Sequence, residues 1–266
     1  MYLLYIYLLK YLFIFVFGTA IGSFINVCIY RIPKGESVVS VPSHCVNCNI
    51  RLRARNLIPI FSFLRQRGKC HDCHEPISPR YIMIETLTGL IFTALLWKYN
   101  FTIEFIAAAF ISSILIVVCF IDLEHGIIPD SLVITATIVG LIFFVLNLFI
   151  PNDIYGDDIW WNPLLGALTG SAILLGISYL GMLLYRSQEV MGGGDIKILF
   201  PVGLFLGWKL MLTALFLSII IAGAACLFLI IIRKIDRKTT IPFGPFISFG
   251  TVLAITLGRQ LLGFYF

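Results

Sequence analysis

Residues 102–121 read TIEFIAAAFISSILIVVCFI, an apolar run with one charged residue. A helix of this length rises about 30 Å, the thickness of the hydrocarbon core of a bilayer. Similar runs recur along all 266 residues, of which 59% are hydrophobic and 12% are charged, and the mean hydropathy is +0.99. Soluble domains have about 45–50% apolar residues. The composition excludes a disordered chain, a collagen and a secreted disulfide scaffold, and it predicts an all-α polytopic membrane protein.

The apolar runs predict about eight transmembrane helices. We expect them at residues 2–30, 81–97, 102–121, 130–150, 163–185, 195–207, 209–232 and 242–265. The first run has no basic start and no small-residue cleavage site, so it should be retained and not removed as a signal peptide. The run at 195–207 would rise only about 20 Å, which predicts a short or partly re-entrant span.

The basic residues indicate the orientation of the chain in the membrane. With eight spans, fifteen of the 19 Lys and Arg residues lie on one side, whereas the connection at 151–162 has three aspartates and no basic residue. The positive-inside rule then places both chain termini outside. It places in the cytoplasm the segments 31–80, 122–129, 186–194 and 233–241. Because the positive charge is confined to these gaps, we expect contact with membrane lipid and none with nucleic acid.

Four of the seven cysteines form two Cys-x-x-Cys pairs in the segment 31–80. They are Cys45, Cys48, Cys70 and Cys73. Four thiolates at this spacing can close a tetrahedral zinc site, and the cytoplasm keeps them reduced. We therefore predict a structural zinc ion; redox-active or incidental cysteines are the alternative. Because four sulfurs complete the coordination, His44, His71 and His74 are expected to be solvated neighbours.

Carboxylates gather at the predicted ends of the spans. Asp122 directly follows the span at 102–121. Asp195 follows three glycines at the start of a helix, where the helix dipole favours negative charge. The alternating topology places both at the same depth. Two carboxylates brought close can share a proton, so that one acts as an acid while the other activates water, as in aspartic proteases. The spacing alone leaves open whether the two helices touch.

Other acids allow other interpretations. Asp130 is expected to cap the helix that it begins, although it or Glu124 could replace Asp122. Glu85 either faces the same site or makes an interhelical hydrogen bond, and Glu104 lies near the outer end of its span. The acids are also compatible with a cation-coupled transporter or channel, although such proteins place acids near the membrane midplane. A membrane scaffold that is stabilised by zinc and has no catalytic activity is a third possibility.

Several segments, in their order along the chain, resemble one known family. They are GSFINV at 22–27, YRIP at 30–33, the two cysteine pairs, RGKC at 67–70, ISPRY at 77–81 followed by Glu85, Ile121-Asp122 with Pro129-Asp130, and GGGDIK at 192–197. They are similar to the type IV prepilin peptidases, which are GxGD-type membrane aspartyl proteases. These bifunctional prepilin leader peptidases and N-methyltransferases serve type IV pilus, type II secretion and competence systems.

The resemblance implies a division of the chain and a catalytic pair. Residues 1–30 would form the first transmembrane helix, 31–80 a cytoplasmic four-cysteine zinc-binding loop associated with methyl transfer, and 81–266 a seven-helix peptidase domain. Asp122 and Asp195 would be the catalytic residues. The distance between them along the sequence is larger than expected for the family, and the excess falls in the outer connection at 151–162.

The resemblance also implies location, substrates and methyl donor. The protein would be a multi-pass protein of the bacterial cytoplasmic (inner) membrane, with its active site on the cytoplasmic side. Its substrates would be prepilins or pseudopilins with a short basic leader and an apolar helix. The new amino terminus would then be methylated by S-adenosylmethionine. Residues 31–80 contain no Gly-rich nucleotide-binding segment, so the sequence does not locate the donor site.

Overall fold

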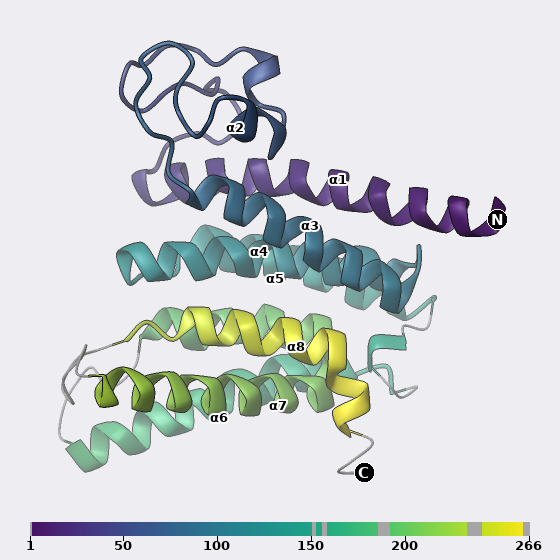
Figure 1. Ribbon diagram of the computed structural model, residues 1–266. Helices are drawn as coiled ribbons and strands as arrows, with labels where there is room; N and C mark the ends of the chain where they lie inside the picture. The colour runs from purple at the N-terminus through teal and green to yellow at the C-terminus, as the bar shows by residue number, and fades with distance from the viewer. Residues whose placement is uncertain (1, 151–152, 156–158, 186–191, 233–240, 263–266) are drawn as a thin grey trace. The chain divides into compact units, whose positions relative to one another are not determined.

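The computed structural model describes residues 2–150, 153–155, 159–185, 192–232 and 241–262 (Figure 1). All regular secondary structure in these ranges is helical, as predicted. The chain forms two compact units, Met1–Phe101 and Thr102–Phe266. The division into 1–30, 31–80 and 81–266 stays a prediction.

The first unit consists of two long helices and the segment that joins them. These helices are α1 (Tyr2–Arg31) and α3 (Arg80–Tyr99), and the joining segment contains η1 (Ile32–Lys34), η2 (Ala54–Asn56) and α2 (Phe61–Arg65). Gly18 and Gly22 of α1 lie against the α3 backbone. A Cβ atom on Gly22 would lie 2.7 Å from Glu85 Cα, and one on Gly18 would lie 2.9 Å from Gly89 Cα. This small-xxx-small pattern lets the two helices pack backbone to backbone.

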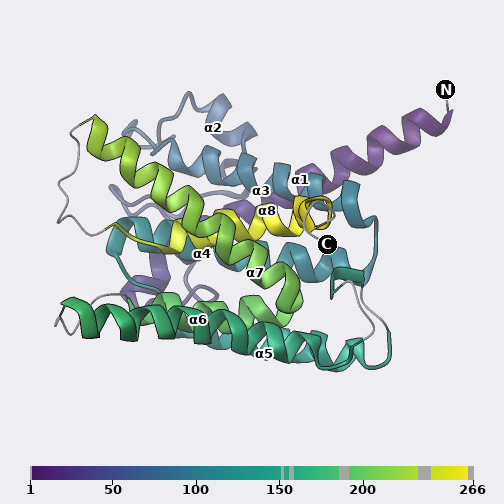
Figure 2. The same cartoon turned by 90° about the horizontal axis from the view of Figure 1, so that it is seen from below.

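The second unit is a helical bundle organised around its longest helix. It contains α4 (Ile103–His125), α5 (Asp130–Asn147), η3 (Asp153–Tyr155), α6 (Asn162–Tyr185), α7 (Gly193–Ile231) and α8 (Gly244–Leu262). Helix α7 packs against α5, α6 and α8, and α8 also packs against α4 (Figure 2). The ends of α4 and α8 that carry Asp122 and Gly244 are thereby brought together.

Helix α7 is interrupted at Gly207, whose φ of 71° is left-handed. The break frees the first N–H of the second half, at Trp208, and Asn162 Oδ1 accepts a hydrogen bond from it at 2.9 Å. Asn162 Nδ2 donates in turn to the Tyr155 carbonyl oxygen at 3.3 Å. A side chain from the start of α6 therefore caps a helix in the middle of the bundle. The break lies between the predicted spans 195–207 and 209–232.

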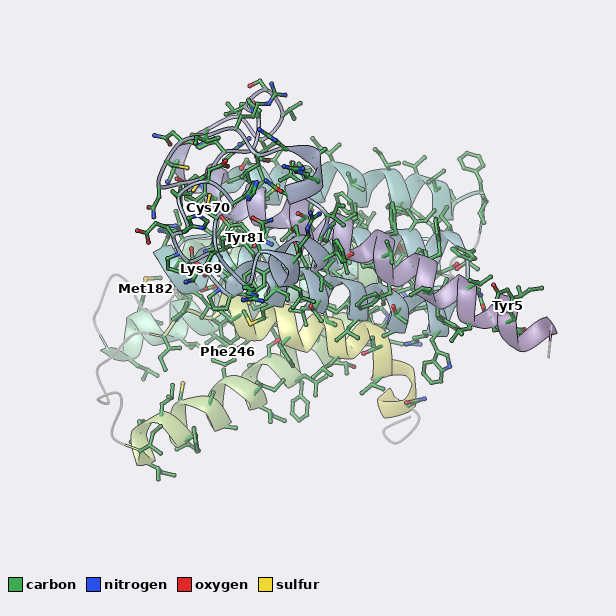
Figure 3. All side chains as sticks on the ribbon, turned by 45° about the horizontal axis from the view of Figure 1, so that its top comes forward. Tyr5, Lys69, Cys70, Tyr81, Met182 and Phe246 are labelled. Atoms are coloured by element: carbon green, nitrogen blue, oxygen red, sulfur yellow. The ribbon has the colours of Figure 1, made fainter. Side chains whose placement is uncertain are left out.

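The structure identifies fewer spans than the eight that the sequence predicts. In the part of the chain that the structure describes, six helices are long and apolar enough to cross a membrane. Helix α7 counts once among them, and α8 contributes only the shorter apolar stretch Gly244–Gly258. The structure thus supports an all-helical membrane protein, and the count of eight stays a prediction. The apolar side chains that face outwards, among them Tyr5 of α1 and Met182 of α6, suit a lipid environment (Figure 3).

Candidate active site and metal centre

Asp122 lies in the last turn of α4, and its side chain is only 6% exposed. The helix ends at Gly126, which has a φ of 65° and whose N–H donates to the Asp122 carbonyl oxygen. The Asp122 carboxylate accepts a 2.8 Å hydrogen bond at Oδ2 from the N–H of Gly244. Because Gly244 is the first residue of α8, this N–H has no partner within its own helix. The start of α8 therefore places positive potential on the carboxylate.

Asp195 lies in the first turn of α7 and is 9% exposed. Two of the three preceding glycines pack so closely that a side chain would not fit without movement. A Cβ on Gly192 would lie 3.1 Å from Asp195 Oδ2, and one on Gly194 would lie 2.9 Å from Ile128 Cβ. Gly194 thus lets the start of α7 approach the loop that follows α4.

The structure brings Asp122 and Asp195 together within the second unit. Their carboxyl groups interact electrostatically. Both are nearly buried, and each faces the positive N-terminal end of a helix. The sequence left open whether these helices meet, and α4 and α7 do pack against each other. Two nearly buried carboxyl groups whose charges interact ionise one at a time, so that one can act as an acid while the other acts as a base, which is what acid–base activation of water requires.

Two other acids near this pair have different surroundings. The expectation that Asp130 caps α5 is wrong: Pro129 is the N-cap residue, without a side-chain cap, and Asp130 is the first residue of the helix. Its Oδ1 instead forms a 2.8 Å ion pair with Lys197 Nζ, in which both side chains are exposed. Glu124 is exposed on the last turn of α4. Neither residue shares the buried position of Asp122.

In the first unit, the four predicted cysteines form one cluster. The sulfur atoms of Cys45, Cys48, Cys70 and Cys73 all lie within 4.8 Å of one another. A tetrahedral site with metal–sulfur bonds of about 2.3 Å has sulfur–sulfur edges of about 3.8 Å. The distance from Cys45 Sγ to Cys73 Sγ is 3.9 Å, so the cluster fits a metal ion of this kind. Among the described residues no histidine belongs to the cluster, and the solvated role expected for His44, His71 and His74 stays a prediction.

The two cysteine pairs have the same backbone geometry. In the first pair, the Cys45 N–H donates a hydrogen bond to the Ile50 carbonyl oxygen. In the second pair, the Cys70 N–H donates a hydrogen bond to the Glu75 carbonyl oxygen. The fourth residue after each first cysteine has a positive φ, 55° at Asn49 and 58° at His74. This repeated turn points both sulfurs of a pair the same way. Burial raises the pKa of Cys45, but hydrogen bonds with the Cys48 and Asn47 backbone and the Cys48 and Cys70 side chains outweigh it and hold the pKa at about 7.

Glu85 is a buried acid of the first unit. It lies on α3 and accepts a 2.7 Å hydrogen bond at Oε2 from the N–H of Ile60. This bond joins α3 to the segment before α2, and both interpretations of Glu85 that the sequence left open stay predictions.

Sequence reasoning missed the contacts that position these groups. Gly244, Asn162 and Ile60 lie far along the chain from the residues that they contact. A signal existed for Gly244, because the Pro245 that follows it is typical of a helix start. Nothing in the sequence pairs that start with Asp122.

Comparisons with known proteins agree with the two units. Residues 16–99 match the Bacterial Peptidase A24 N-terminal domain, and residues 109–227 match the Type IV leader peptidase family. A prepilin leader peptidase/N-methyltransferase of Bacillus subtilis (strain 168) is 32% identical over 252 residues, which cover 95% of this chain and 96% of the relative. Another of that name, from Legionella pneumophila, is 31% identical over 96% of this chain and 94% of the relative. No solved structure matches.

The chain therefore belongs to the type IV leader peptidase family. This membership favours a peptidase over the transporter or channel that the sequence alone left open.

Proposed function

We propose that this protein is a membrane aspartic endopeptidase that removes the short basic leader from prepilins or pseudopilins and then methylates the new amino terminus. The single observation that carries the peptidase half is the pairing of Asp122 with Asp195, two nearly buried and interacting carboxyl groups at helix ends. Membership of the type IV leader peptidase family supports the choice of substrate.

In this mechanism one carboxylate takes a proton from a water molecule as the water oxygen attacks the scissile carbonyl carbon. The other, protonated, carboxyl group donates its proton to the carbonyl oxygen. When the tetrahedral intermediate collapses, the C–N bond breaks and the leaving amine takes up a proton, so that no covalent intermediate with the enzyme forms. The Gly244 N–H holds Asp122 Oδ2 and fixes the orientation of that carboxylate.

The site is proposed to lie at the cytoplasmic surface of the bacterial inner membrane. The basic segments 31–80 and 233–241 support this orientation by the positive-inside rule. A precursor with a charged leader and an apolar helix would present its cleavage junction at the same surface. Substrate would then reach the carboxyl pair by diffusion in the plane of the membrane.

The first unit is proposed to serve the methylation step. A zinc ion bound by Cys45, Cys48, Cys70 and Cys73 would lock the two cysteine turns together. S-adenosylmethionine would supply an activated methyl group. The amine nitrogen attacks the methyl carbon, the electron pair of the carbon–sulfur bond remains on sulfur, and the product ammonium loses a proton to solvent.

The test is cleavage of a prepilin by the purified protein in lipid, followed by mass spectrometry of the product. Mass spectrometry reports both the loss of the leader and the added methyl group. Asp122→Asn and Asp195→Asn should each reduce cleavage by about 10²–10⁴-fold, because each removes one proton-transfer group. Asp130→Asn is the matched control, since its exposed carboxylate pairs with Lys197, and it should cleave normally. Cleavage by Asp195→Asn at the wild-type rate would exclude the proposed site.

A further inference from the structure

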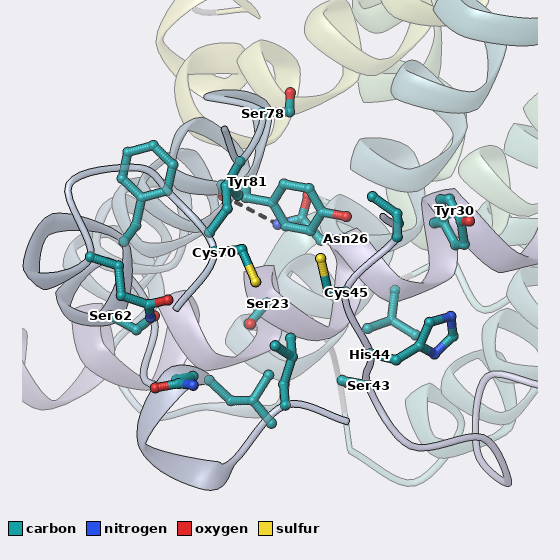
Figure 4. A pocket seen from close by; sticks show the side chains of 18 of the residues that line it. Ser23, Asn26, Tyr30, Ser43, His44, Cys45, Ser62, Cys70, Ser78 and Tyr81 are labelled. Atoms are coloured by element: carbon teal, nitrogen blue, oxygen red, sulfur yellow. Dashed lines mark hydrogen bonds between the residues drawn. The ribbon is translucent and has the colours of Figure 1, made fainter. Parts of the chain in front are cut away.

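The first unit contains a cavity of about 570 Å³ beside the cysteine cluster (Figure 4). Its walls come from α1, the two cysteine turns, the segment around α2 and the start of α3. Cavities that bind small molecules have volumes of about 300–1,000 Å³. Apolar side chains such as Leu52, Phe63 and Ile77 line it together with many polar side chains, both acidic and basic. The cavity therefore has the size and the mixed lining of a binding site for a small molecule.

Asn26 provides an unsatisfied hydrogen-bond acceptor in this cavity. Its side chain is only 1% exposed. The amide nitrogen donates to two carbonyl oxygens, those of Gly22 and Tyr81, each at 3.2 Å. These two acceptors fix the orientation of the amide, because the amide oxygen could not take the place of the nitrogen there. The remaining atom, Oδ1, is buried and has no hydrogen-bond partner among the described residues. Such a buried acceptor is satisfied by a water molecule or by a group of a ligand.

Glu85 lines the same cavity and supplies negative charge. Its side chain is 7% exposed, and its Oε2 accepts a hydrogen bond from the Ile60 N–H. A carboxylate has about four lone-pair sites, so this bond leaves acceptor capacity. Arg31 and Arg80 also line the cavity, so its lining carries charge of both signs and suits a ligand that has a cationic and an anionic group.

The backbone that Glu85 holds is strained. Ile60 has a φ of 60° and a ψ of −53°, and the Phe61 N–H donates to the Pro59 carbonyl oxygen across it, which makes a γ-turn. A positive φ is unfavourable for a β-branched residue, and such strain gathers at ligand sites. The turn leads into α2, from which Ser62, Phe63 and Gln66 line the cavity. Glu85 thus contacts both the cavity and the segment that forms one of its walls.

We propose that this cavity binds S-adenosylmethionine, with the positive charge of the donor held by Glu85 and Asn26. The inference rests on the proposed methylation and names its binding site. The donor carries a sulfonium and an ammonium group, which match a buried carboxylate and an unsatisfied amide oxygen. Its adenine ring would pack against the apolar wall and against Tyr30 or Tyr81, which also line the cavity.

The test measures binding of radiolabelled S-adenosylmethionine to the purified, zinc-loaded, full-length protein in lipid nanodiscs, independently of turnover. Glu85→Gln should weaken binding at least about tenfold, because it removes a hydrogen-bonded charge. Glu36→Gln is the matched control, since Glu36 is exposed, belongs to the same unit and does not line the cavity. Zinc content and leader cleavage of each variant show whether it has folded, and both should equal those of the wild type.

A second variant distinguishes loss of the Glu85 charge from misfolding of the Ile60 turn. Leu52→Trp fills part of the cavity without touching Glu85's charge, and it should also weaken donor binding at least about tenfold. Wild-type protein that cleaves prepilin but binds no donor would overturn this inference and leave the peptidase standing. Donor binding unchanged in both Glu85→Gln and Leu52→Trp would overturn it equally. Wild-type protein that binds donor but cleaves no prepilin would instead contradict the proposed peptidase.

Discussion

The N–H of Gly244 donates a hydrogen bond to Asp122 Oδ2 across 2.8 Å, and the two residues are 122 positions apart in the sequence. This contact joins the end of α4 to the start of α8. It determines which carboxylate oxygen of Asp122 is already occupied when a water molecule or a substrate arrives.

Gly244→Ala should therefore impair leader cleavage. A Cβ at this position would lie 2.7 Å from Asp122 Oδ2, so either the carboxylate or the start of α8 must move. A shift of this kind in a catalytic group costs about 10- to 100-fold in rate. The measurement is the initial rate of prepilin cleavage at equal protein concentration. Gly223→Ala serves as the control, because a Cβ on Gly223 meets nothing within 4 Å, and it should cleave like the wild type.

The glycines before Asp195 should differ in their tolerance to alanine. A Cβ on Gly194 would lie 2.9 Å from Ile128 Cβ, whereas a Cβ on Gly193 meets nothing within 4 Å. Gly194→Ala should push the start of α7 away from the loop after α4 and reduce cleavage at least about tenfold. Gly193→Ala should retain full activity in the same assay. Equal losses in the two variants would mean that the segment requires flexibility and not close packing.

Metal analysis of the purified protein should give one zinc ion per chain. The Cys45→Ser, Cys70→Ser double variant should lose it, and the segment 36–78 should become sensitive to protease, since metal binding stabilises such folds. Cys226→Ser should keep its zinc, because Cys226 is outside the cluster. Thiols bind zinc as thiolates, so affinity should fall as the pH is lowered and protons compete for the sulfurs. Full zinc content in the double variant would contradict the assignment.

Asn162→Ala should destabilise the second unit. The substitution removes the cap of Trp208 N–H and the bond to the Tyr155 carbonyl oxygen. Loss of a helix cap costs about 1–2 kcal/mol in the free energy of unfolding. Unfolding in mixed detergent micelles, followed by circular dichroism, measures the change. Ser113→Ala should have a smaller effect, because the Ser113 hydroxyl donates to Ala109 within its own helix.

Local sequence patterns predicted most of the helices and the metal cluster. The expected ends of the helices at 81–97, 130–150 and 163–185 agree with α3, α5 and α6 to within about three residues, because a membrane span needs a continuous apolar run. The four cysteines could be grouped because each pair is local and a metal needs four ligands. Asp122 and Asp195 could be paired only through the assumed alternation of spans.

Contacts between distant segments could not be predicted. Asn26 and Glu85 line one cavity only because α1 and α3 pack against each other and the two cysteine turns fold over them. The left-handed φ of Gly207 depends on Asn162, which no local pattern links to it. Asp130 illustrates the converse: its position before an apolar run suggested a helix cap, but Lys197 lies within reach and binds its side chain.

The backbone contact between Gly22 and Glu85 should make the two proposed activities genetically separable. Gly22 carries no reactive group. A Cβ atom of any larger residue at position 22 would lie 2.7 Å from Glu85 Cα and would therefore displace Glu85. Substitutions along this face of α1 should therefore yield a protein that still trims prepilins but releases them unmethylated. Cells carrying such an allele would show whether assembly of the trimmed subunits depends on the methyl group.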